Sequence, residues 1–584
     1  MNRREFLDLL AKVSVSAAVA GCSTTSLRTQ PEDLYRAPLG DGEVRLLHIT
    51  DTHAQLQPIY FREPSVNIGV GEANGRWPHL VGRNVLAALG EVSPRDAHAL
   101  TYLDFSEAAE RFGRVGGFAH LKTLIDRLRA PAPSRSLLLD GGDTWQGSGT
   151  ALWTQGRDMV DACNLLGVDV MTGHWEFTYP DAQTLANVEA FQGDFVAQNV
   201  RATEDALFEG VPVHDEDTGH VFRPYVMREL GGRRVAVIGQ AFPYTPIANP
   251  QRFIPHWSFG IQEDDLAELV ASVRADEKPD AVVVLSHNGM DVDLKLASRV
   301  PGIDFILGGH THDGVPVPVP VKNSGGVTVV TNAGSNGKFV GVLDLSFGAS
   351  GVSGYRYRLM PVFANLLDAD PDMQSHIDAA RAPYQERLAE PLAVTDSLLY
   401  RRGNFNGTFD QVICDALRQE LDVEISLSPG FRWGTTVLPG DTITMERVLD
   451  QTAITYPETY VREMPGEQLK FILESVCDNL FNPDPYLQQG GDMVRVGGVR
   501  FACDPTRPMG ERISDLTLDS GTALDPGKSY KVAGWATVGS VSPGAPVWDV
   551  VADYLRAEKT VRLASINEPV LKGVSGNLGL GGQT

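Results

Sequence analysis

Short apolar runs alternate with amphipathic stretches along the first part of the chain. The runs lack the strict polar and apolar alternation of a strand with one wet face, and they lie at residues 44–50, 137–139, 168–171, 235–238, 281–285 and 303–307. Between them, residues 118–128 and 266–273 carry apolar side chains at i, i+3, i+4 and i+7 spacing, which predicts helices. Buried strands interleaved with helices predict an α/β layered fold, whose functional sites gather beyond the carboxyl ends of the strands.

The pattern changes further along the chain and divides it into segments. We expect residues 44–365 to form the first domain, 366–393 an interdomain helix or linker, 394–572 a second α+β domain, and 573–584 a flexible glycine-rich tail. Within the first domain, residues 54–115 form a long insertion. Its aromatic and glycine residues, as in 60–69, predict an ordered lid that walls a channel to the site.

The N-terminus is typical of an export signal. Arg3-Arg4-Glu5-Phe6-Leu7 precedes a modest apolar stretch and resembles a twin-arginine signal, so residues 1–22 are expected to be a targeting segment and 23–43 a tether. Val19-Ala20-Gly21-Cys22 resembles a lipobox, and an ordinary small-residue cleavage site explains it equally well. Both alternatives predict export to the periplasm, with membrane contact through a Cys22 lipid anchor in the first of them.

Charge and cysteine content narrow the class of protein. The chain has 50 Lys and Arg against 74 Asp and Glu, a net charge of −24, which argues against nucleic acid as a partner. Five cysteines are too few for a disulfide framework, and Cys163 is expected in a core. One bridge among Cys414, Cys477 and Cys503 is compatible with export, and the sequence does not assign the pair.

Histidine and aspartate residues follow the ends of successive predicted strands. Singly, each has an ordinary explanation, such as a helix cap or a turn. Together, a set of imidazoles and carboxylates without thiolates predicts a site for two ions of Mn, Fe or Zn, if one carboxylate bridges them. The candidate ligands are Asp51, His53, Asp143, His174, His287, His310 and His312.

The order of these motifs resembles the calcineurin-like dinuclear metallophosphoesterases, in the branch of the periplasmic 5′-nucleotidases. The matching motifs are Asp51-x-His53, Gly142-Asp143, Gly173-x-x-Glu176, Ser286-His287 and Gly309-His310-Thr311-His312. The resemblance implies a four-layer α-β-β-α first domain and a 5′-nucleotidase-like α+β second domain. It also implies two ligand sets that share Asp143, one with Asp51, His53 and His312 and the other with His174, His287 and His310.

The third motif departs from the nucleotidase pattern. Where that branch has Gly-Asn-His-Glu-Phe-Asp, this chain has Gly173-His174-Trp175-Glu176-Phe177-Thr178. An indole therefore replaces the catalytic histidine of the branch, and Thr178 replaces the aspartate that orients it. With the insertion at 60–69 and the paired arginines, this pattern is similar to the SoxB thiosulfohydrolases of the Sox sulfur-oxidation system.

The resemblance implies a reaction and roles for several residues. A metal-bridging hydroxide would release sulfate from a cysteine S-sulfonate or S-thiosulfonate on the SoxYZ carrier, in thiosulfate oxidation. Trp175, His174 and Glu176 are the catalytic candidates, and Arg432 and Trp175 the substrate-binding ones. Arg432 is equally compatible with a structural role, while Asp492 and Arg495 are weaker candidates.

Alternatives for the metal and for the activity stay open. Two Mn²⁺ ions are favoured because a site for a weakly binding ion is best filled before export of the folded protein, whereas Zn²⁺ or Fe remain alternatives. A periplasmic 5′-nucleotidase or cyclic phosphodiesterase is one rival function. A non-catalytic component that binds the carrier is another.

Overall fold

The computed structural model describes residues 34–62, 68–403 and 405–580, and the described residues from Pro38 onward form one compact unit. The predicted export signal at 1–22 lies outside the described residues, as does most of the tether expected at 23–43. Among the described helices, none has both the length and the apolar content required to cross a bilayer.

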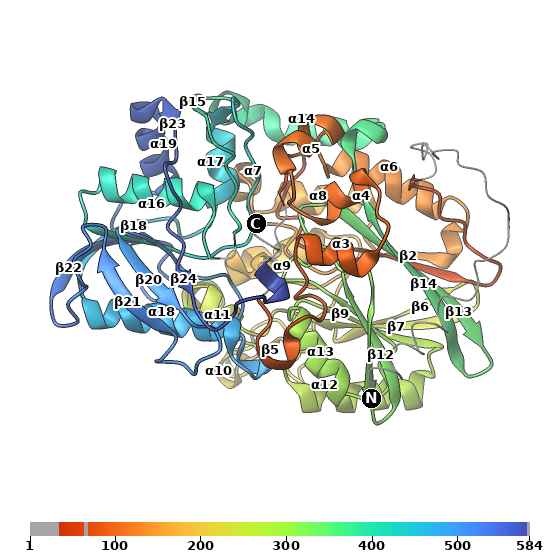
Figure 1. Ribbon diagram of the computed structural model, residues 1–584. Coiled ribbons are helices and arrows are strands. Elements are labelled where there is room, and N and C mark those ends of the chain that lie inside the picture. The colour runs from red at the N-terminus through yellow and green to blue at the C-terminus, as the bar shows by residue number, and fades with distance from the viewer. Residues whose placement is uncertain (1–33, 63–67, 404, 581–584) are drawn as a thin grey trace. The chain divides into compact units, whose positions relative to one another are not determined.

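Two six-stranded sheets form the centre of the first domain (Figure 1). One has the order β14 (Gly351–Pro361), β13 (Phe339–Gly348), β1 (Val44–Ile49), β2 (Ser136–Asp140), β3 (Val170–Met171), β4 (Asp194–Phe195). The other has the order β11 (Val319–Asn323), β12 (Gly326–Asn332), β10 (Phe305–Gly308), β9 (Ala281–Ser286), β7 (Arg233–Gln240), β6 (Tyr225–Leu230). Strands β1 to β4 run parallel, and so do β7, β9, β10 and β12.

The two sheets pack face to face through an apolar core, and helices cover their outer faces. Leu46 and Leu139 of the first sheet and Val283 and Leu307 of the second belong to this core. Helices α12 (Glu263–Ser272) and α13 (Met290–Arg299) pack on the outer face of the second sheet. Helices α6 (Phe118–Arg129) and α8 (Arg157–Leu166) lie over the first sheet (Figure 1). The four-layer α-β-β-α architecture expected from the sequence is therefore confirmed, and its strands are buried on both faces as their apolar runs require.

The insertion at 54–115 contains more regular structure than its sequence indicated. Helices α3 (Arg83–Leu89), α4 (Pro94–Leu100) and α5 (Phe105–Phe112) lie within it, while residues 63–67 are outside the described part. Tyr60 forms an isolated β-bridge with Thr436 of the second domain. The described part of the insertion is thus ordered and reaches the second domain, and its role as a channel wall remains a prediction.

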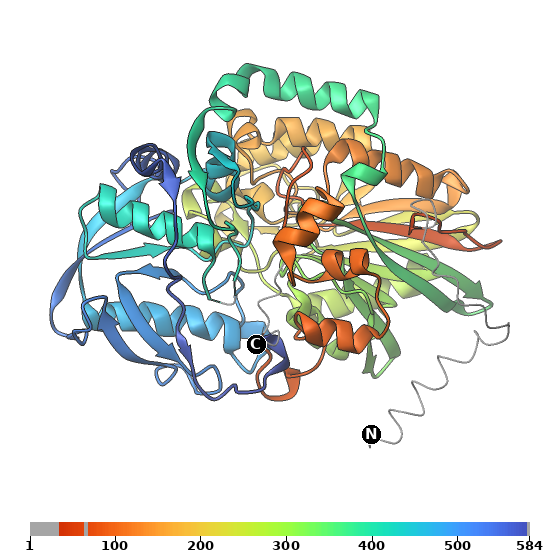
Figure 2. The same cartoon turned by 45° about the horizontal axis from the view of Figure 1, so that its top comes forward.

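The second domain is an α+β unit, as expected. Its main sheet has the order β18 (Thr459–Pro465), β22 (Ser529–Trp535), β16 (Ile425–Ser428), β19 (Arg495–Gly497). Helices α16 (Thr408–Glu420) and α19 (Val547–Glu558) pack in a core that includes β22, and α18 (Gly466–Phe481) packs in a second core with β16. Helix α14 (Pro371–Arg381), at the top of Figure 2, leads from β14 toward this domain, within the segment expected to link the domains.

The C-terminal segment differs from the flexible tail expected at 573–584. Val574 is buried in the core that contains α18, and the Asn577 side chain donates a hydrogen bond to the Gly69 carbonyl at 2.8 Å. Val81 N–H donates to the Leu578 carbonyl. Glycine content suggested mobility, but these contacts hold residues 574–580 against the insertion, and residues 581–584 lie outside the described part.

The structure distinguishes the cysteines that the sequence left equivalent. The Sγ atoms of Cys477 and Cys503 lie 3.5 Å apart in the core around α18, as free thiols. Cys414 is buried on α16, and Cys163 is buried on α8 as expected. Of the three cysteines considered for a bridge, Cys477 and Cys503 are therefore the pair that the fold places side by side.

Asp158 on α8 should make stability depend on pH. Burial raises the pKa of its carboxyl to about 6, although Thr154 Oγ1 donates to Oδ1 at 2.7 Å. Because the folded state holds this proton more tightly than the unfolded state, stability is highest below about pH 4 and falls as the pH rises through about 6. Asp158→Asn removes this loss, so we expect the variant to gain up to about 3 kcal/mol relative to wild type above pH 7.

Urea unfolding of metal-depleted wild type and Asp158→Asn, at about pH 4.5 and about pH 8, measures this difference. An equal stability difference between the two proteins at both pH values would contradict the prediction.

Candidate dinuclear metal centre

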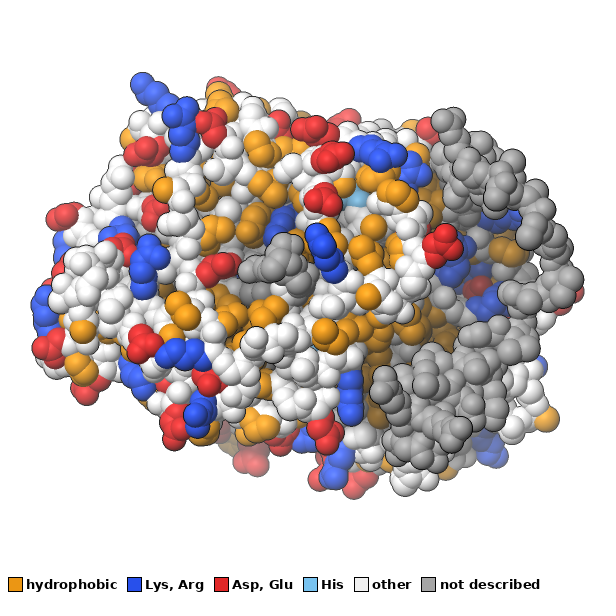
Figure 3. Space-filling view, viewed as in Figure 1, with side chains coloured by type: hydrophobic (Ala, Val, Ile, Leu, Met, Phe, Trp, Pro, Cys, Tyr) orange, Lys and Arg blue, Asp and Glu red, His pale blue; other side chains and the backbone are white. Residues whose placement is uncertain are grey.

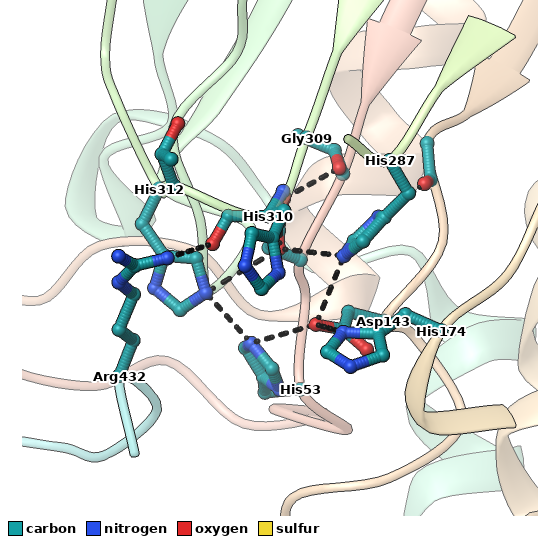
Figure 4. Close-up of polar contacts among 12 residues, drawn as sticks. His53, Asp143, His174, His287, Gly309, His310, His312 and Arg432 are labelled. Atoms are coloured by element: carbon teal, nitrogen blue, oxygen red, sulfur yellow. Dashed lines mark hydrogen bonds and ion pairs between the residues drawn. The ribbon is translucent and has the colours of Figure 1, made fainter. Parts of the chain in front are cut away.

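All seven candidate ligands lie at the carboxyl ends of parallel strands, in the loops that follow them. Asp51 and His53 follow β1, Asp143 follows β2, and His174 follows β3. On the second sheet, His287 follows β9, and His310 and His312 follow β10. Since parallel strands end at one edge of each sheet, residues far apart in sequence meet there (Figure 4).

Five of these ligands have left-handed backbone conformations. The φ angles are +51° at Asp51, +46° at His53, +60° at Asp143, +70° at His310 and +59° at His312. Such values are uncommon outside glycine and cost of the order of 1–3 kcal/mol each, so they persist where surrounding contacts fix them. This strained backbone lets both histidines of the His-x-His pair, His310 and His312, reach the same cluster of donor atoms.

Two groups of donor atoms converge around the Asp143 carboxylate. The first is Asp51, His53, Asp143 and His312, and the second is Asp143, His174, His287 and His310. Within each group, one donor atom from every residue lies within 4.8 Å of the others. These are the same two sets that the family resemblance implied, and Asp143 belongs to both.

The donor atoms of the first group lie close together. His53 Nε2 and His312 Nε2 lie 3.0 Å apart, and His312 Nε2 lies 3.3 Å from Asp51 Oδ1. The Asp51 carboxylate accepts the Thr50 hydroxyl at 2.6 Å and the His310 N–H at 3.0 Å. These two hydrogen-bond donors fix the orientation of the Asp51 carboxylate from behind the donor group.

The second group is fixed by hydrogen bonds behind its ligands. Asp143 Oδ2 lies 3.1 Å from His174 Nδ1 and 3.1 Å from His287 Nε2. Asp143 Oδ1 accepts the Trp175 N–H at 2.7 Å. His287 Nδ1 donates to the Gly141 carbonyl at 2.6 Å, which leaves Nε2 as the nitrogen that faces Asp143.

Burial and mutual charge control protonation in the cluster. Burial lowers the pKa of His53 to about 3 and holds the pKa values of His310 and His312 well below their usual range. Burial opposes the charge on His287 as well, but Asp143 and Asp51 raise its pKa to about 10. Neutral imidazole is the form that ligates metal ions, so three of these side chains are prepared for coordination.

The donor set fits two divalent cations. The ring nitrogens nearest Asp143 Oδ2 are His174 Nδ1 and His287 Nε2, each at 3.1 Å, and His53 Nε2 at 3.8 Å. Two buried carboxylates, Asp51 and Asp143, also belong to one donor group, and burial together with Asp143 raises the pKa of Asp51. Two cations held by the seven donors would offset this carboxylate repulsion.

Glu176 lies behind the cluster and contacts it through the backbone. One carboxylate oxygen accepts the N–H groups of Thr144 and Trp145 at 2.8 and 3.1 Å, and the other accepts those of Asp143 and His174 at 3.1 and 2.8 Å. Glu176 is fully buried. The sequence suggested a catalytic residue, and these contacts favour a residue that positions two ligands.

We expect Glu176→Ala to weaken metal retention by about 10- to 100-fold, because it leaves four buried N–H groups without an acceptor beside the ligands. Glu474 offers a matched control in the second domain. It is also a buried carboxylate, and it accepts the backbone N–H groups of Gly510, Arg512 and Ile513. Metal content after dialysis against a chelator, with thermal unfolding of both variants, measures the effect. Equal metal loss in Glu474→Ala would contradict a specific role for Glu176.

Aromatic side chains from both domains line one side of the site. The Trp175 ring meets the Trp433 and Phe431 rings edge-on, with centroids 5.1 and 5.5 Å apart. Phe431 and Trp433 stack on each other at 4.2 Å, and Trp433 lies 5.8 Å from the His53 ring. Thr178, at the other altered position of the motif, is buried with its hydroxyl 2.7 Å from that of Thr455.

The arginines near the site are engaged by protein groups. Arg432 Nη1 donates to the His310 carbonyl at 3.1 Å (Figure 4). Its Nε donates to Asp492 Oδ1 at 3.0 Å, and its Nη2 to the Gly491 carbonyl at 2.8 Å. Arg495 is buried between Asp410 and Asp492, away from the donor groups. Arg402 was not a candidate, because nothing in its local sequence marks it, yet its Nη1 donates to the Thr311 carbonyl at 3.2 Å.

The ligands are nearly inaccessible to solvent. Their exposed fractions range from 0% at Asp51 and His287 to 7% at His310. On the face shown in Figure 3, the pale blue of histidine is almost absent. Any substrate must therefore reach the cluster by a narrow path.

Comparison with known protein families agrees with this geometry. Residues 44–314 match the calcineurin-like phosphoesterase family, and residues 393–548 match the 5′-nucleotidase C-terminal domain family. The fold and the site thus define a metal-dependent hydrolase of the calcineurin-like phosphoesterase class. A crystal structure of SoxB from Thermus thermophilus, described as a sulfate thiohydrolase in complex with glycerol, aligns with a TM-score of 0.83 at 36% identity, over 92% of this chain and 98% of that one. The chain belongs to the SoxB family.

More distant relatives share the architecture. A 5′-nucleotidase precursor from Thermus thermophilus aligns with a TM-score of 0.71 at 23% identity, over 91% of this chain and 99% of that chain, which shows a common fold. The trifunctional nucleotide phosphoesterase YfkN of Bacillus subtilis is 25% identical over 474 residues, or 74% of this chain. The chain spans only 31% of the length of YfkN.

Proposed function

We propose that this hydrolase releases sulfate from a cysteine S-sulfonate or S-thiosulfonate carried by a SoxYZ-type protein in thiosulfate oxidation. The T. thermophilus relative described as a sulfate thiohydrolase supports this substrate class. The observation that carries the proposal is the indole of Trp175 at the position of the nucleotidase catalytic histidine. It lies in an aromatic wall beside the metal ligands.

The reaction is a hydrolysis without net oxidation. Water adds to the sulfonate sulfur, the bond from that sulfur to the cysteine sulfur or persulfide breaks, and the products are a thiolate or persulfide, sulfate and two protons. Two divalent ions held by the seven donors would supply Lewis acidity toward the sulfonate oxygens and lower the pKa of bound water. Asp143, held by the Trp175 N–H and the His287 ring, would fix the spacing of the two ligand groups.

The leaving group explains why the histidine and aspartate of the nucleotidases are dispensable. A thiol titrates near pH 8.5, roughly, whereas an alcohol does not ionise usefully, so a departing thiolate needs no positioned acid. Thr178 is bound to Thr455 and buried, so it orients no histidine. Trp175 would exclude water and contact the sulfane sulfur, while His174 would adjust the charge of the second ligand group.

The aromatic side chains disfavour a nucleotide substrate. A nucleobase held between two aromatic rings needs those rings to lie far enough apart for a third ring to fit between them. Phe431 and Trp433 instead stack directly on each other, with centroids 4.2 Å apart. This arrangement leaves no slot between the two rings. The match of residues 393–548 to the 5′-nucleotidase C-terminal domain nevertheless keeps nucleotidase activity as the rival to be tested.

We propose Mn²⁺ as the resident ion and the periplasm as the compartment. Nitrogen and oxygen donors accept Mn²⁺, Fe²⁺ and Zn²⁺, and Mn²⁺ binds most weakly of the three. Export of the folded chain by a twin-arginine signal would protect a manganese site from competing ions in the periplasm. An anchor at Cys22 would keep the enzyme at the membrane.

The decisive experiment compares sulfate release from S-sulfonated carrier with hydrolysis of AMP and of a nitrophenyl phosphate, on chain matured in the cytoplasm. We expect sulfate release with little phosphatase activity. Rapid turnover of either phosphate ester would overturn the proposal. For the indole, unchanged sulfate release by Trp175→Ala together with no gain of phosphatase activity in Trp175→His would exclude the role given to it.

A further inference from the structure

A loop of the second domain lies directly on one metal-ligand candidate. Gly490 packs against the imidazole of His310 so closely that a Cβ added at position 490 would overlap His310 Nε2. The neighbouring Gly491 differs, because the nearest atom to an added Cβ is the Gly430 carbonyl oxygen at 3.8 Å. Both glycines have left-handed backbones, with φ of +81° and +76°. The lack of a side chain at position 490 therefore serves a close approach in addition to backbone freedom.

The same loop carries the anchor for two arginines that reach across the domain boundary. Asp492 accepts Arg432 Nε at 3.0 Å and Arg402 Nε at 3.3 Å. Arg432 then donates to the carbonyl of His310, and Arg402 to the carbonyl of Thr311. Charged donors make strong hydrogen bonds, so the backbone of the His-x-His segment is held from the second domain.

One face of the His310 ring is held by the first domain. Phe242 stacks on it with centroids 4.2 Å apart and an interplanar angle of 28°. The imidazole is thus contacted at its Nε2 edge by Gly490 and on one face by Phe242, while its backbone keeps a φ of +70°. A strained backbone persists only where surrounding contacts hold it, and the contacts of His310 with Phe242, Gly490 and Arg432 can do so.

From these contacts we infer that residues 488–493, together with Arg432 and Arg402, are a positioning element that holds His310 in the second ligand group. The second domain would then complete a metal site whose ligands all come from the first. Gly490 and Arg432 are positioning residues in this scheme, and the inference rests on the dinuclear site proposed above.

The inference gives Arg432 a role that differs measurably from substrate binding. A guanidinium that binds the sulfonate would, when removed, raise KM and leave metal content unchanged. A guanidinium that holds His310 would, when removed, lower metal occupancy before substrate is added.

The main experiment is a matched pair of glycine variants. Gly490→Ala and Gly491→Ala introduce the same methyl group at nearly the same φ, but only the first meets His310. Metal-free wild type and both variants are titrated with Mn²⁺, and bound ions per chain are counted by elemental analysis. The exchange-coupled Mn²⁺ pair is followed by electron paramagnetic resonance.

We expect wild type and Gly491→Ala to bind two ions with the coupled signal. We expect Gly490→Ala to bind its second ion about 10- to 100-fold more weakly. At Mn²⁺ concentrations that fill both sites of wild type, the variant should hold one ion and show no coupled signal. Two tightly bound, coupled ions in Gly490→Ala would overturn the inference and leave the proposed function intact. A wild type that binds fewer than two ions would overturn both.

A second variant covers the case in which Gly490→Ala does not fold. Arg432→Met keeps an apolar stem in place of the arginine stem, removes the guanidinium and leaves Asp492 paired with Arg402 and Arg495. We expect Arg432→Met to weaken binding of the second ion. The double variant should lose less binding free energy for that ion than the sum of the two single variants, because both substitutions act through His310. An unchanged metal content in Arg432→Met with a raised KM would assign Arg432 to the substrate and overturn its positioning role.

Discussion

Asp143→Asn is expected to abolish binding of the metal pair and to lower the hydrolytic rate by more than about 100-fold. Loss of a residue that only hydrogen-bonds to a metal ligand costs up to about 100-fold, and Asp143 is itself a candidate ligand. Asp143 is the residue common to both donor groups, and its Oδ2 atom lies 3.1 Å from ring nitrogens of His174 and of His287. Burial opposes its charge, but the two histidines hold the pKa of Asp143 well below its usual range. The amide removes the charge that balances two cations.

Asp140→Asn is the matched control for that experiment. Asp140 is also fully buried, and burial raises the pKa of its carboxyl well above the usual range. Its Oδ1 accepts Gly142 N–H and the Thr144 hydroxyl, which an amide oxygen can also do. Metal content and rate should therefore stay near wild type, and equal losses in the two variants would show that the effect of Asp143→Asn is not specific.

Asp410→Ala should have the largest effect on stability, lowering the free energy of unfolding by about 3–5 kcal/mol. Asp410 accepts Arg401 Nε at 2.8 Å and Arg495 Nε at 3.0 Å, and all three side chains are buried. Removing the carboxylate leaves two buried guanidinium groups without their main counter-charge. Urea unfolding of the metal-depleted chain, followed by tryptophan fluorescence, measures the loss.

Asp519→Ala tests whether any carboxylate that pairs with two arginines has this effect. Asp519 lies 2.9 Å from Arg418 and 3.5 Å from Arg500, but its side chain is 42% exposed. Exposed pairs contribute up to about 1 kcal/mol, so this variant should be nearly as stable as wild type. A loss below about 1 kcal/mol in Asp410→Ala would contradict the importance of the buried network.

Much of the first domain could be predicted from sequence because its strands are buried on both faces. Their apolar runs are continuous, each ends in a turn with glycine or a polar residue, and parallel pairing brings those ends together. The convergence of Asp51, Asp143 and His310 follows from that rule alone. The altered third motif was equally visible, because Trp175 and Thr178 stand where a nucleotidase needs other residues.

Contacts between the domains could not be predicted in this way. Arg402 and Gly490 lie far from His310 in sequence, and no local periodicity relates them to it. The stacking of Phe431 on Trp433 depends on how the second domain meets the first. The ordered C-terminal segment was missed for a related reason, since glycine-rich sequence suggests freedom while the contacts of Asn577 with the insertion arise from tertiary structure.

The burial of the ligands has a consequence for how the protein should be prepared. Because no ligand is more than 7% exposed and the loop at 488–493 covers His310, an ion can leave only when the chain opens. Exchange is then governed by the rate of opening rather than by relative affinity. The metal found in a purified sample would therefore record the medium and the compartment in which that sample folded, so refolding in a defined metal solution is the way to set it.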